Sequence, residues 1–312
     1  MSVILDNAND AMLYNTSFVQ KISSQEGLEK VAGSATEFCR VKIREGSFTR
    51  KIIPPKQITA ADLDQAVDSD SPMRIIHKDK VSEAYPVTFS EQAQQRYYIG
   101  DKFQVFYTHI QSEEFHKLTE ELMTYRVPIK QIIQENYLKD IQATEDKLFI
   151  STVDDILKKK EDEKAGTAVY TAAGPFTPSI LAEGLKLLVK RQVPIGTILI
   201  SESDWMDLLK LQQPAAGSQV MEDIIHNGYS YTKLLGYNFV RSIKNEIVKP
   251  GHIYLFSTPE YLGVFDVLTD VKAFMETKAN KFTFHLWENI GISIGNDNGV
   301  AKIKLTGAGY ED

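Results

Sequence analysis

Three stretches of this chain decide how it is interpreted: Phe48-Thr49-Arg50-Lys51-Ile52-Ile53, Met73-Arg74-Ile75-Ile76-His77-Lys78 and Ala84-Tyr85-Pro86-Val87-Thr88-Phe89. Each has the composition of a short strand. The first two are separated by Pro54-Pro55, by an acidic stretch and by Ser71-Pro72. The sequence therefore predicts an extended two-stranded ribbon with a polar tip, running from Ser47 to Phe89.

Such a ribbon has little means of burying its strands within its own subunit. An isolated hairpin is only marginally stable in water, and its open edges invite pairing with another chain. We therefore expect the ribbon to lie across neighbouring copies, with apolar side chains buried there and basic ones paired with acidic groups, each exposed pair contributing ~0–1 kcal/mol. The candidate contact residues are Phe48, Arg50, Lys51, Ile52, Arg74, Ile75 and Tyr85.

Composition sets broad limits on the function. The 312 residues, 43% of them apolar, can form one large domain or two moderate ones with a sizeable core. The net charge of −7, from 35 basic and 42 acidic residues, argues against a broad basic face for DNA. It is compatible with enclosing nucleic acid without adhering to it.

Targeting signals and covalent links are not indicated. Cys39 is the only cysteine, so an internal disulfide and a cysteine-based zinc site are excluded. The first residues lack a basic start and a continuous apolar run, so we expect no signal peptide. No apolar run approaches the roughly 20 residues needed to cross a bilayer. We expect the protein to work in a reducing, soluble compartment without a membrane partner.

The clearest helical pattern lies at about 128–150. Pro128 suits the first helical position, where its missing N–H costs nothing. The stripe that follows, at steps of three and four, comprises Ile129, Ile132, Ile133, Tyr137, Ile141, Thr144 and Leu148. About 22 residues at ~1.5 Å each make a rod on the order of 33 Å long. We expect an exposed boundary loop in the charged run 158–166.

The remaining elements follow from shorter patterns. We expect a strand at 104–110, a helix start at Ser112, and an α/β region after residue 166. Its expected helices are 178–192, 203–211 and a short one ending at Ile225, and its expected strands are 197–200, 237–242, 253–256 and 263–267. Strands at 282–288, 290–294 and 300–305 complete the chain. Asn296-Asp297-Asn298-Gly299 predicts a hairpin that joins the last two.

The order of these elements resembles the tailed-phage major capsid proteins of the Hong Kong 97 type. The phrases that carry the resemblance are Thr177-Pro178 before a helix, the passage from Gly196 to Trp205, Leu234-Leu235-Gly236-Tyr237, Gly251-His252-Ile253-Tyr254, and Trp287-Glu288-Asn289-Ile290. Their order and spacing, over most of the chain from about residue 40, make the match.

The resemblance implies an α+β, Hong Kong 97-like capsid fold in four parts. These are an N-terminal arm (1–40), an extended β-hairpin loop (41–92), a peripheral domain (93–164 and 271–312) with its spine helix at about 128–150, and an axial α/β domain (165–270). The implied role is a structural one, without catalytic residues, metal or cofactor.

The resemblance also implies the partners and the place of action. Copies of a major capsid protein form hexamers and pentamers, which close into an icosahedral shell around the double-stranded DNA of a tailed bacteriophage without reading its sequence. We expect separate scaffolding and portal proteins, and cement proteins remain open. The implied location is the virion capsid, assembled in the host cytoplasm.

Two alternatives stay open. The same fold forms encapsulin nanocompartments, which enclose enzymes rather than a genome. From another class, Gly291-Ile292-Ser293-Ile294-Gly295 matches the G-x-S-x-G elbow of serine hydrolases. That elbow requires a sharp strand-to-helix turn, whereas Ser293 lies in an alternating strand pattern.

The acidic stretch of Asp62, Asp64, Asp68 and Asp70 does not have the residue spacing of an EF-hand calcium loop. It is better read as a solvated loop tip with a short helix begun by Thr59.

Overall fold

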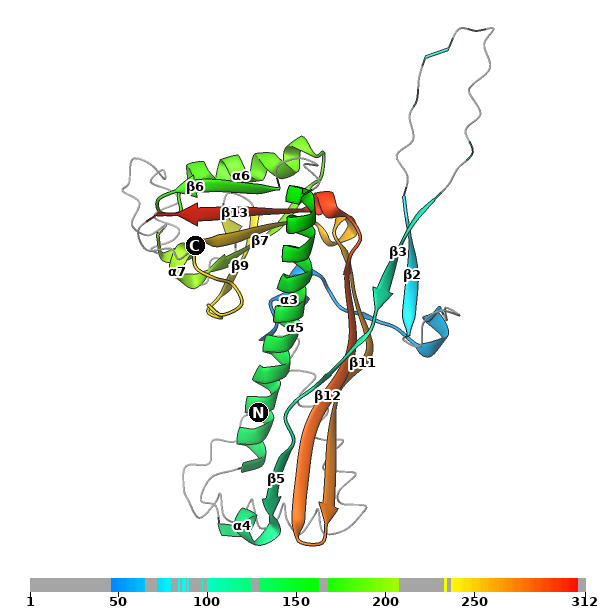
Figure 1. The fold of residues 1–312 in the computed structure, drawn as a ribbon, viewed down its shortest axis with the longest axis vertical. Coiled ribbons are helices and arrows are strands. Elements are labelled where there is room, and N and C mark those ends of the chain that lie inside the picture. The colour runs from blue at the N-terminus through cyan, green and yellow to red at the C-terminus, as the bar shows by residue number, and fades with distance from the viewer. Residues whose placement is uncertain are drawn as a thin grey trace.

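The longest elements of the molecule run side by side along its long axis (Figure 1). They are the helix α5 (Ile129–Asp162) and the antiparallel strands β11 (Gly263–Lys278) and β12 (Lys281–Ile294). The computed structural model describes residues 46–64, 72–79, 100–124, 129–162, 168–207, 233–234 and 237–307, with a few isolated positions between 84 and 97. Within these ranges no helix is long and apolar enough to cross a bilayer.

Helix α5 is the predicted spine helix, but it is longer than expected. It has 34 residues and includes 158–162, the first part of the charged run predicted to be a loop, whereas 163–166 lie outside the described residues. The buried face explains the extension: Val153, Leu157 and Lys160 continue the spacing of three and four and are at most 7% exposed. This buried face therefore continues the helix into the charged run.

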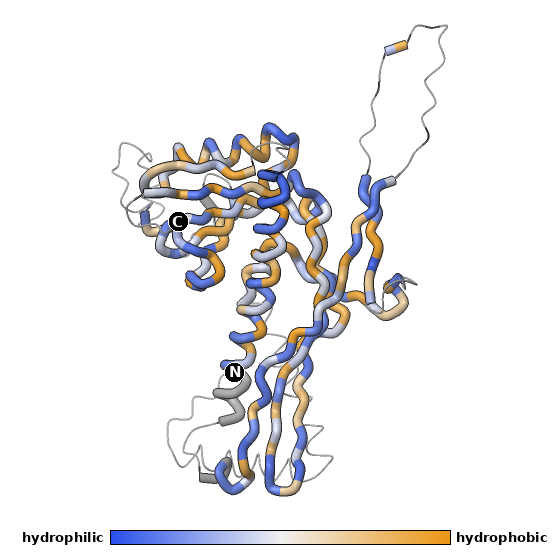
Figure 2. Tube along the Cα trace, in the orientation of Figure 1, coloured by the Kyte–Doolittle hydropathy of each residue, from blue (hydrophilic) through white to orange (hydrophobic). Residues whose placement is uncertain are grey.

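The face of α5 packs against a long sheet in the strand order β1-β11-β12-β4, with β5 also pairing with β12. The short strands are β1 (Lys56–Gln57), β4 (Thr108–Gln111) and β5 (Phe115–Leu118), and α4 (Thr119–Thr124) follows. Buried and less buried positions alternate along most of β12, and hydrophobic and hydrophilic residues are interspersed along it (Figure 2). One face of this sheet can therefore be buried and the other solvated.

The predicted helix start at Ser112 is wrong. The Ser112 N–H donates to the Leu286 carbonyl at 2.8 Å, and its Oγ accepts from the Leu286 N–H at 2.9 Å. Ser112 therefore joins β4 and β5 along β12, and helix α4 begins only at Thr119. The expected strand at 104–110 is likewise divided between β3 (Asp101–Phe106) and β4.

A second sheet of six strands lies at one end of the molecule, in the order β6-β13-β10-β7-β9-β8. Its strands are β6 (Val169–Ala173), β7 (Ile195–Ser201), β8 (Lys233–Leu234), β9 (Tyr237–Ser242), β10 (His252–Ser257) and β13 (Val300–Thr306). Helix α6 (Pro178–Lys190) covers it through Leu181, Leu185 and Leu188. Helix α7 (Glu202–Asp207) agrees with the start of the predicted second helix. The helix expected to end at Ile225 lies outside the described residues.

The predicted hairpin at Asn296–Gly299 is wrong. The 3-10 turn η5 (Asp297–Gly299) carries the chain from the long sheet to the six-stranded sheet, so β12 and β13 do not pair. β13 instead lies between β10 and β6. The strands before and after this turn therefore belong to different sheets. The other short turn, η4 (Pro259–Tyr261), leads into β11.

The ribbon exists, and one of its strands is the strand predicted at 73–78, but the partner of that strand differs from the predicted one. β2 (Met73–Lys78) pairs with β3 (Asp101–Phe106), from Met73 opposite Phe106 to Lys78 opposite Asp101. The β2–β3 ribbon projects from the side of the molecule (Figure 1). Residues 48–53 take no part in it. They contain helix α3 (Thr49–Ile52), because Phe48 and Ile52 have helical spacing and are buried on one face. Only isolated positions of 84–89 are described, and the pairing expected for this stretch lies outside them.

The predicted short helix begun by Thr59 is confirmed. It is the 3-10 turn η1 (Ala60–Asp62), in which the Thr59 N–H and hydroxyl donate to Asp62 Oδ2 at 3.0 and 2.7 Å. Asp64 accepts from the Ile75 N–H at 2.8 Å. These two carboxylates therefore shape the turn that leads into the ribbon, while Asp68 and Asp70 lie outside the described residues.

Candidate functional site

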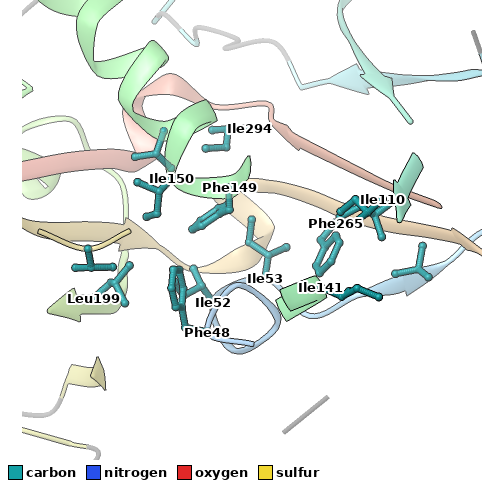
Figure 3. Packing of buried hydrophobic residues seen from close by; sticks show 14 of the residues in the cluster. Phe48, Ile52, Ile53, Ile110, Ile141, Phe149, Ile150, Leu199, Phe265 and Ile294 are labelled. Atoms are coloured by element: carbon teal, nitrogen blue, oxygen red, sulfur yellow. The ribbon is translucent and has the colours of Figure 1, made fainter. Parts of the chain in front are cut away.

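The chain segment 46–53, here called the anchor segment, folds back onto its own subunit. Phe48 and Ile52 point from α3 into the same apolar cluster as Phe149 of α5 (Figure 3). Phe48, Ile52 and Ile53 are each at most 4% exposed. This packing fixes the point at which the N-terminal part of the chain meets the spine helix.

Asp146 of α5 holds the start of the anchor segment. Its Oδ1 accepts from the Ser47 hydroxyl at 2.8 Å, from the Thr49 hydroxyl at 2.7 Å and from the Thr49 N–H at 3.1 Å. Its Oδ2 accepts from Lys244 Nζ at 2.7 Å. A carboxylate at the first turn of α3 satisfies an N–H that has no partner within the helix. One buried side chain thus ties together the anchor segment, α5 and the loop after β9.

A buried ion cluster lies beside it. Arg50 Nη2 approaches Glu145 Oε1 at 2.6 Å and Glu288 Oε2 at 3.3 Å, and Arg50 Nε lies 3.1 Å from both oxygens of Glu145. The side chains of both glutamates are 0% exposed. The guanidinium also lies over the Phe265 ring, 5.2 Å from its centroid. Removing one partner from a buried pair leaves an uncompensated charge, which costs about 3–5 kcal/mol.

The cluster holds one cation and two carboxylates, and this imbalance shifts its pKa values. Burial raises the pKa of Glu288 well above its usual value, and the neighbouring Glu145 raises it further, whereas Arg50 lowers it. Burial alone lowers the pKa of Arg50, but the hydrogen bonds and charges of Glu145 and Glu288 more than offset this, so the pKa is raised. Arg50 therefore stays charged, and Glu288 favours its protonated form.

A second buried carboxylate, Asp266 of β11, holds the base of the ribbon. Its Oδ2 accepts from Arg74 Nη1 at 2.7 Å and from the Tyr107 hydroxyl at 3.2 Å. The Asp266 side chain is 0% exposed and that of Arg74 is 18% exposed. Burial and the charge of Asp266 raise the pKa of Tyr107. Because Arg74 lies on β2 and Tyr107 directly follows β3, Asp266 holds both strands against the long sheet.

The predicted contact residues fall into three groups. Phe48, Arg50 and Ile52 are 4%, 6% and 1% exposed, so their assignment to a contact with another subunit is corrected: this chain itself covers them. Lys51 is exposed, Ile75 is half-buried, and Arg74 pairs with Asp266 of its own chain. Tyr85 lies outside the described residues. The ribbon adds a residue that the sequence did not single out, Phe106, which is 53% exposed.

Ser293 lies within β12, opposite Val264 of β11, and its Oγ donates to the Gln104 carbonyl at 3.2 Å. The strand continues to Ile294 and leads into the turn η5, not into a helix. The backbone geometry of a nucleophile elbow is therefore missing at this serine. The described ranges contain no group of three His, Cys, Asp or Glu residues placed to hold a metal ion.

Sequence reasoning missed the buried carboxylates, although two of them carried a signal. Glu145 follows Ile141 and precedes Phe149 by four residues, so it continues the buried face of α5. Glu288 has the same parity as Phe282, Phe284 and Leu286, which face the core. A charged residue at a core-facing position indicates a buried partner. Asp266 gave no such signal. Phe265, Asp266 and Val267 are all buried, so this part of β11 lacks the alternation that marks a core-facing position.

Comparison with known proteins places this geometry in a fold family. No protein-family model and no curated protein matches the sequence. Solved structures do match. The virus-like particle from Pyrococcus furiosus is 14% identical with a TM-score of 0.53, and the match covers 88% of this chain and 99% of that chain. The mature capsid of bacteriophage PhiM1 is 12% identical with a TM-score of 0.57, covering 83% and 87%.

The structure of Microbacterium phage Oxtober96 has a TM-score of 0.60 at 9% identity, over 84% of this chain and 91% of that chain. At these identities the likeness concerns the fold. This chain has an α+β fold of the Hong Kong 97 capsid type, as its sequence pattern predicts.

Proposed function

We propose that this chain is the subunit of a closed protein shell, and that its activity is self-assembly. The observation that carries the proposal is the match of 83–88% of the chain to subunits of phage capsids and of a virus-like particle. Repetition of one subunit lets contacts that are weak singly produce a stable assembly. Hexamers and pentamers of this chain, closing into an icosahedral shell, are the arrangement that we propose.

The β2–β3 ribbon supports this function. A two-stranded ribbon is marginal by itself, yet here its base is fixed to the long sheet through Asp266. Phe106, 53% exposed, and the half-buried Ile75 offer apolar surface on it. We propose that the ribbon lies across a neighbouring subunit, with Ile75, Tyr85 and Phe106 as contact residues and Arg74 as the residue that fixes its base. Lys51, exposed on α3 outside the ribbon, is proposed as a further contact residue.

The division of the subunit follows from the two sheets. We propose a peripheral part, formed by α5 and the long sheet, and an axial part, formed by the six-stranded sheet with α6 and α7. We assign β13 to the axial part because it pairs with β10 and β6, so the proposed boundary differs from the one predicted from the sequence. In a shell, the axial part would surround the hexamer and pentamer axes.

For the content of the shell we propose the double-stranded DNA of a tailed bacteriophage, enclosed without sequence-specific contacts. The net charge of −7 supports an interior that does not adhere to DNA. Separate scaffolding and portal proteins, assembly in the host cytoplasm and final location in the virion belong to the same proposal.

A nanocompartment that encloses proteins is the second candidate. The observation that favours it is the size match to the Pyrococcus furiosus virus-like particle, of which 99% of the chain is covered. In a nanocompartment the shell would have no portal and its content would be an enzyme. Both candidates require the same contacts between subunits, so only the molecules enclosed in the shell distinguish them.

Sedimentation velocity of the purified chain tests the proposal. We expect particles of megadalton size, and a single 35.2 kDa species under all assembly conditions would contradict both shell candidates. Nuclease-protected DNA within particles from the native host favours the capsid. Particles that hold a co-purifying protein and no DNA favour the nanocompartment.

A further inference from the structure

Gly291 and Ser293 lie on one face of β12, because residues two apart in a strand point the same way, and Gly295 directly follows the strand. The side chains of Phe103 and Val105, on β3, and of Tyr107, which follows it, approach this face. A glycine inside a strand often marks a place where another backbone approaches closely. We call Gly291, Ser293 and Gly295 the glycine seat.

The seat has no room for side chains at its two glycines. A Cβ at Gly291 would lie 2.8 Å from Val105 Cγ1 and 3.1 Å from the Tyr107 ring. A Cβ at Gly295 would lie 2.7 Å from the Phe103 ring. The described glycines with positive φ are Gly174, Gly251 and Gly307, so both seat glycines have backbone angles that alanine tolerates. Space is therefore the reason for glycine here.

The atoms around Gly291 cannot move aside easily. Val105 is 0% exposed, and Tyr107 is held by its hydrogen bond to Asp266. Asp266 is itself the cross-strand partner of Gly291. In the middle of the seat, the Ser293 hydroxyl bonds to the Gln104 carbonyl of β3. The G-x-S-x-G spacing thus provides two positions without a side chain, where β3 can approach closely, and a hydrogen-bond donor between them.

We propose that the glycine seat sets the direction in which the ribbon leaves the subunit. β3 rests on the seat, and Asp266 holds it there through Arg74 and Tyr107. A side chain at Gly291 would raise β3 at its base, and the ribbon would act as a lever. A tilt of about 10° over six residue pairs, or about 20 Å, moves the far end by about 3 Å. The consequence for assembly rests on the shell function proposed above.

The experiment measures ribbon direction and assembly separately. Spin labels are placed at the exposed Lys102 of the ribbon and Glu276 of β11, as Lys102→Cys and Glu276→Cys in a Cys39→Ala background, and the labelled chain is diluted into unlabelled chain. We expect Gly291→Ala to shift the mean label distance by about 3 Å. We expect it to reduce the yield of closed shells by roughly tenfold, the consequence of overpacking a fixed contact.

A compensating variant separates a steric effect from a general folding defect. Val105→Ala removes the methyl group that the new Cβ would meet, so adding it to Gly291→Ala should restore both the distance and the shell yield. Phe103→Leu should do the same for Gly295→Ala, which provides a second pair if the first does not fold. Glu183→Ala, at an exposed position of α6 outside the seat, serves as the control, with an unchanged distance.

An unchanged distance in both glycine variants would overturn the seat, as would failure of both compensating variants to restore it. If the wild-type chain forms no shells, the shell function fails, but the label distance still decides the role of the seat. If the wild-type chain forms shells and the glycine variants do so equally well with the original distance, the seat alone is refuted.

Discussion

The anchor segment and the β2–β3 ribbon have similar strand-like sequences, yet one is buried in its own subunit and the other projects from it. In the anchor segment, Phe48 and Ile52 are four residues apart and share a helical face, and Arg50 finds two carboxylates inside the chain. In the ribbon, β2 and β3 pair with each other and Phe106 stays exposed. The comparison shows that one part holds the subunit together and the other is available to neighbours.

The strongest test of this contrast is Arg50→Ala. We expect it to lower the free energy of unfolding by about 3–5 kcal/mol, because Glu145 and Glu288 would be left buried without their cation. The exposed neighbour is the matched control: Lys51→Ala should change stability by no more than about 0.5 kcal/mol. Urea denaturation followed by circular dichroism measures both, and equal effects would refute the difference in burial.

Arg74→Ala should have the next largest effect. Asp266 would lose its charged partner at the base of the ribbon, a loss of about 1.5–3 kcal/mol for a hydrogen bond to a charged group. Lys186→Ala removes an exposed ion pair with Glu183 on α6 and should cost about 0–1 kcal/mol. If Arg74→Ala is as mild as Lys186→Ala in the same denaturation assay, Asp266 does not hold the ribbon.

Glu288→Gln should stabilise the protein at neutral pH. The folded state keeps a proton on Glu288 at pH values where the unfolded chain has lost it, so this contribution is full below pH 4.5 and is lost as the pH rises through the raised pKa. Glutamine mimics the protonated side chain at every pH.

The measurement is urea denaturation between pH 4.5 and pH 8, with the exposed Glu183→Gln as control. We expect the gain from Glu288→Gln to grow with pH while the control stays flat. A loss of stability at pH 8 would mean that ionised Glu288 is needed to balance Arg50.

Phe106→Asp should have the smallest effect on stability, within about 0.5 kcal/mol, because Phe106 is 53% exposed on the ribbon. It should nevertheless abolish closed shells, since a charge would enter the proposed contact. Phe149→Ala, in the apolar cluster beneath the anchor segment, is the matched aromatic substitution and should cost about 3–5 kcal/mol. Shells of normal yield from Phe106→Asp would remove Phe106 from the contact.

Local sequence patterns predicted the elements whose burial is set by their own spacing. Helix 178–192 and strands 237–242 and 253–256 lie within about two residues of α6, β9 and β10. Sheet partnership was harder to predict. Asn298-Gly299 is a strong hairpin signal, yet β12 finds its partners in β11 and β4, and β13 finds its own in β10 and β6. The actual hairpin turns at Ala279-Asn280, where Ala279 has a φ of 55°.

The site was less accessible from the sequence than the fold. The glutamates around Arg50 occupy core-facing positions of α5 and β12, so their burial could have been inferred. Their common partner lies 95 and 238 residues away in the chain, and no local pattern encodes such a distance. The composition of 48–53 is typical of a strand, although Phe48 and Ile52 have helical spacing. The sequence therefore predicted a ribbon that begins at Ser47, whereas its first strand begins at Met73.

Electron cryomicroscopy of the assembled full-length chain tests the central claim most directly, because it shows which molecule covers each segment. We predict a closed shell in which every anchor segment lies in its own subunit and every β2–β3 ribbon touches an adjacent copy, with Phe106 at the contact. A homogeneous population of single subunits, or a shell whose ribbons touch no other copy, would contradict it.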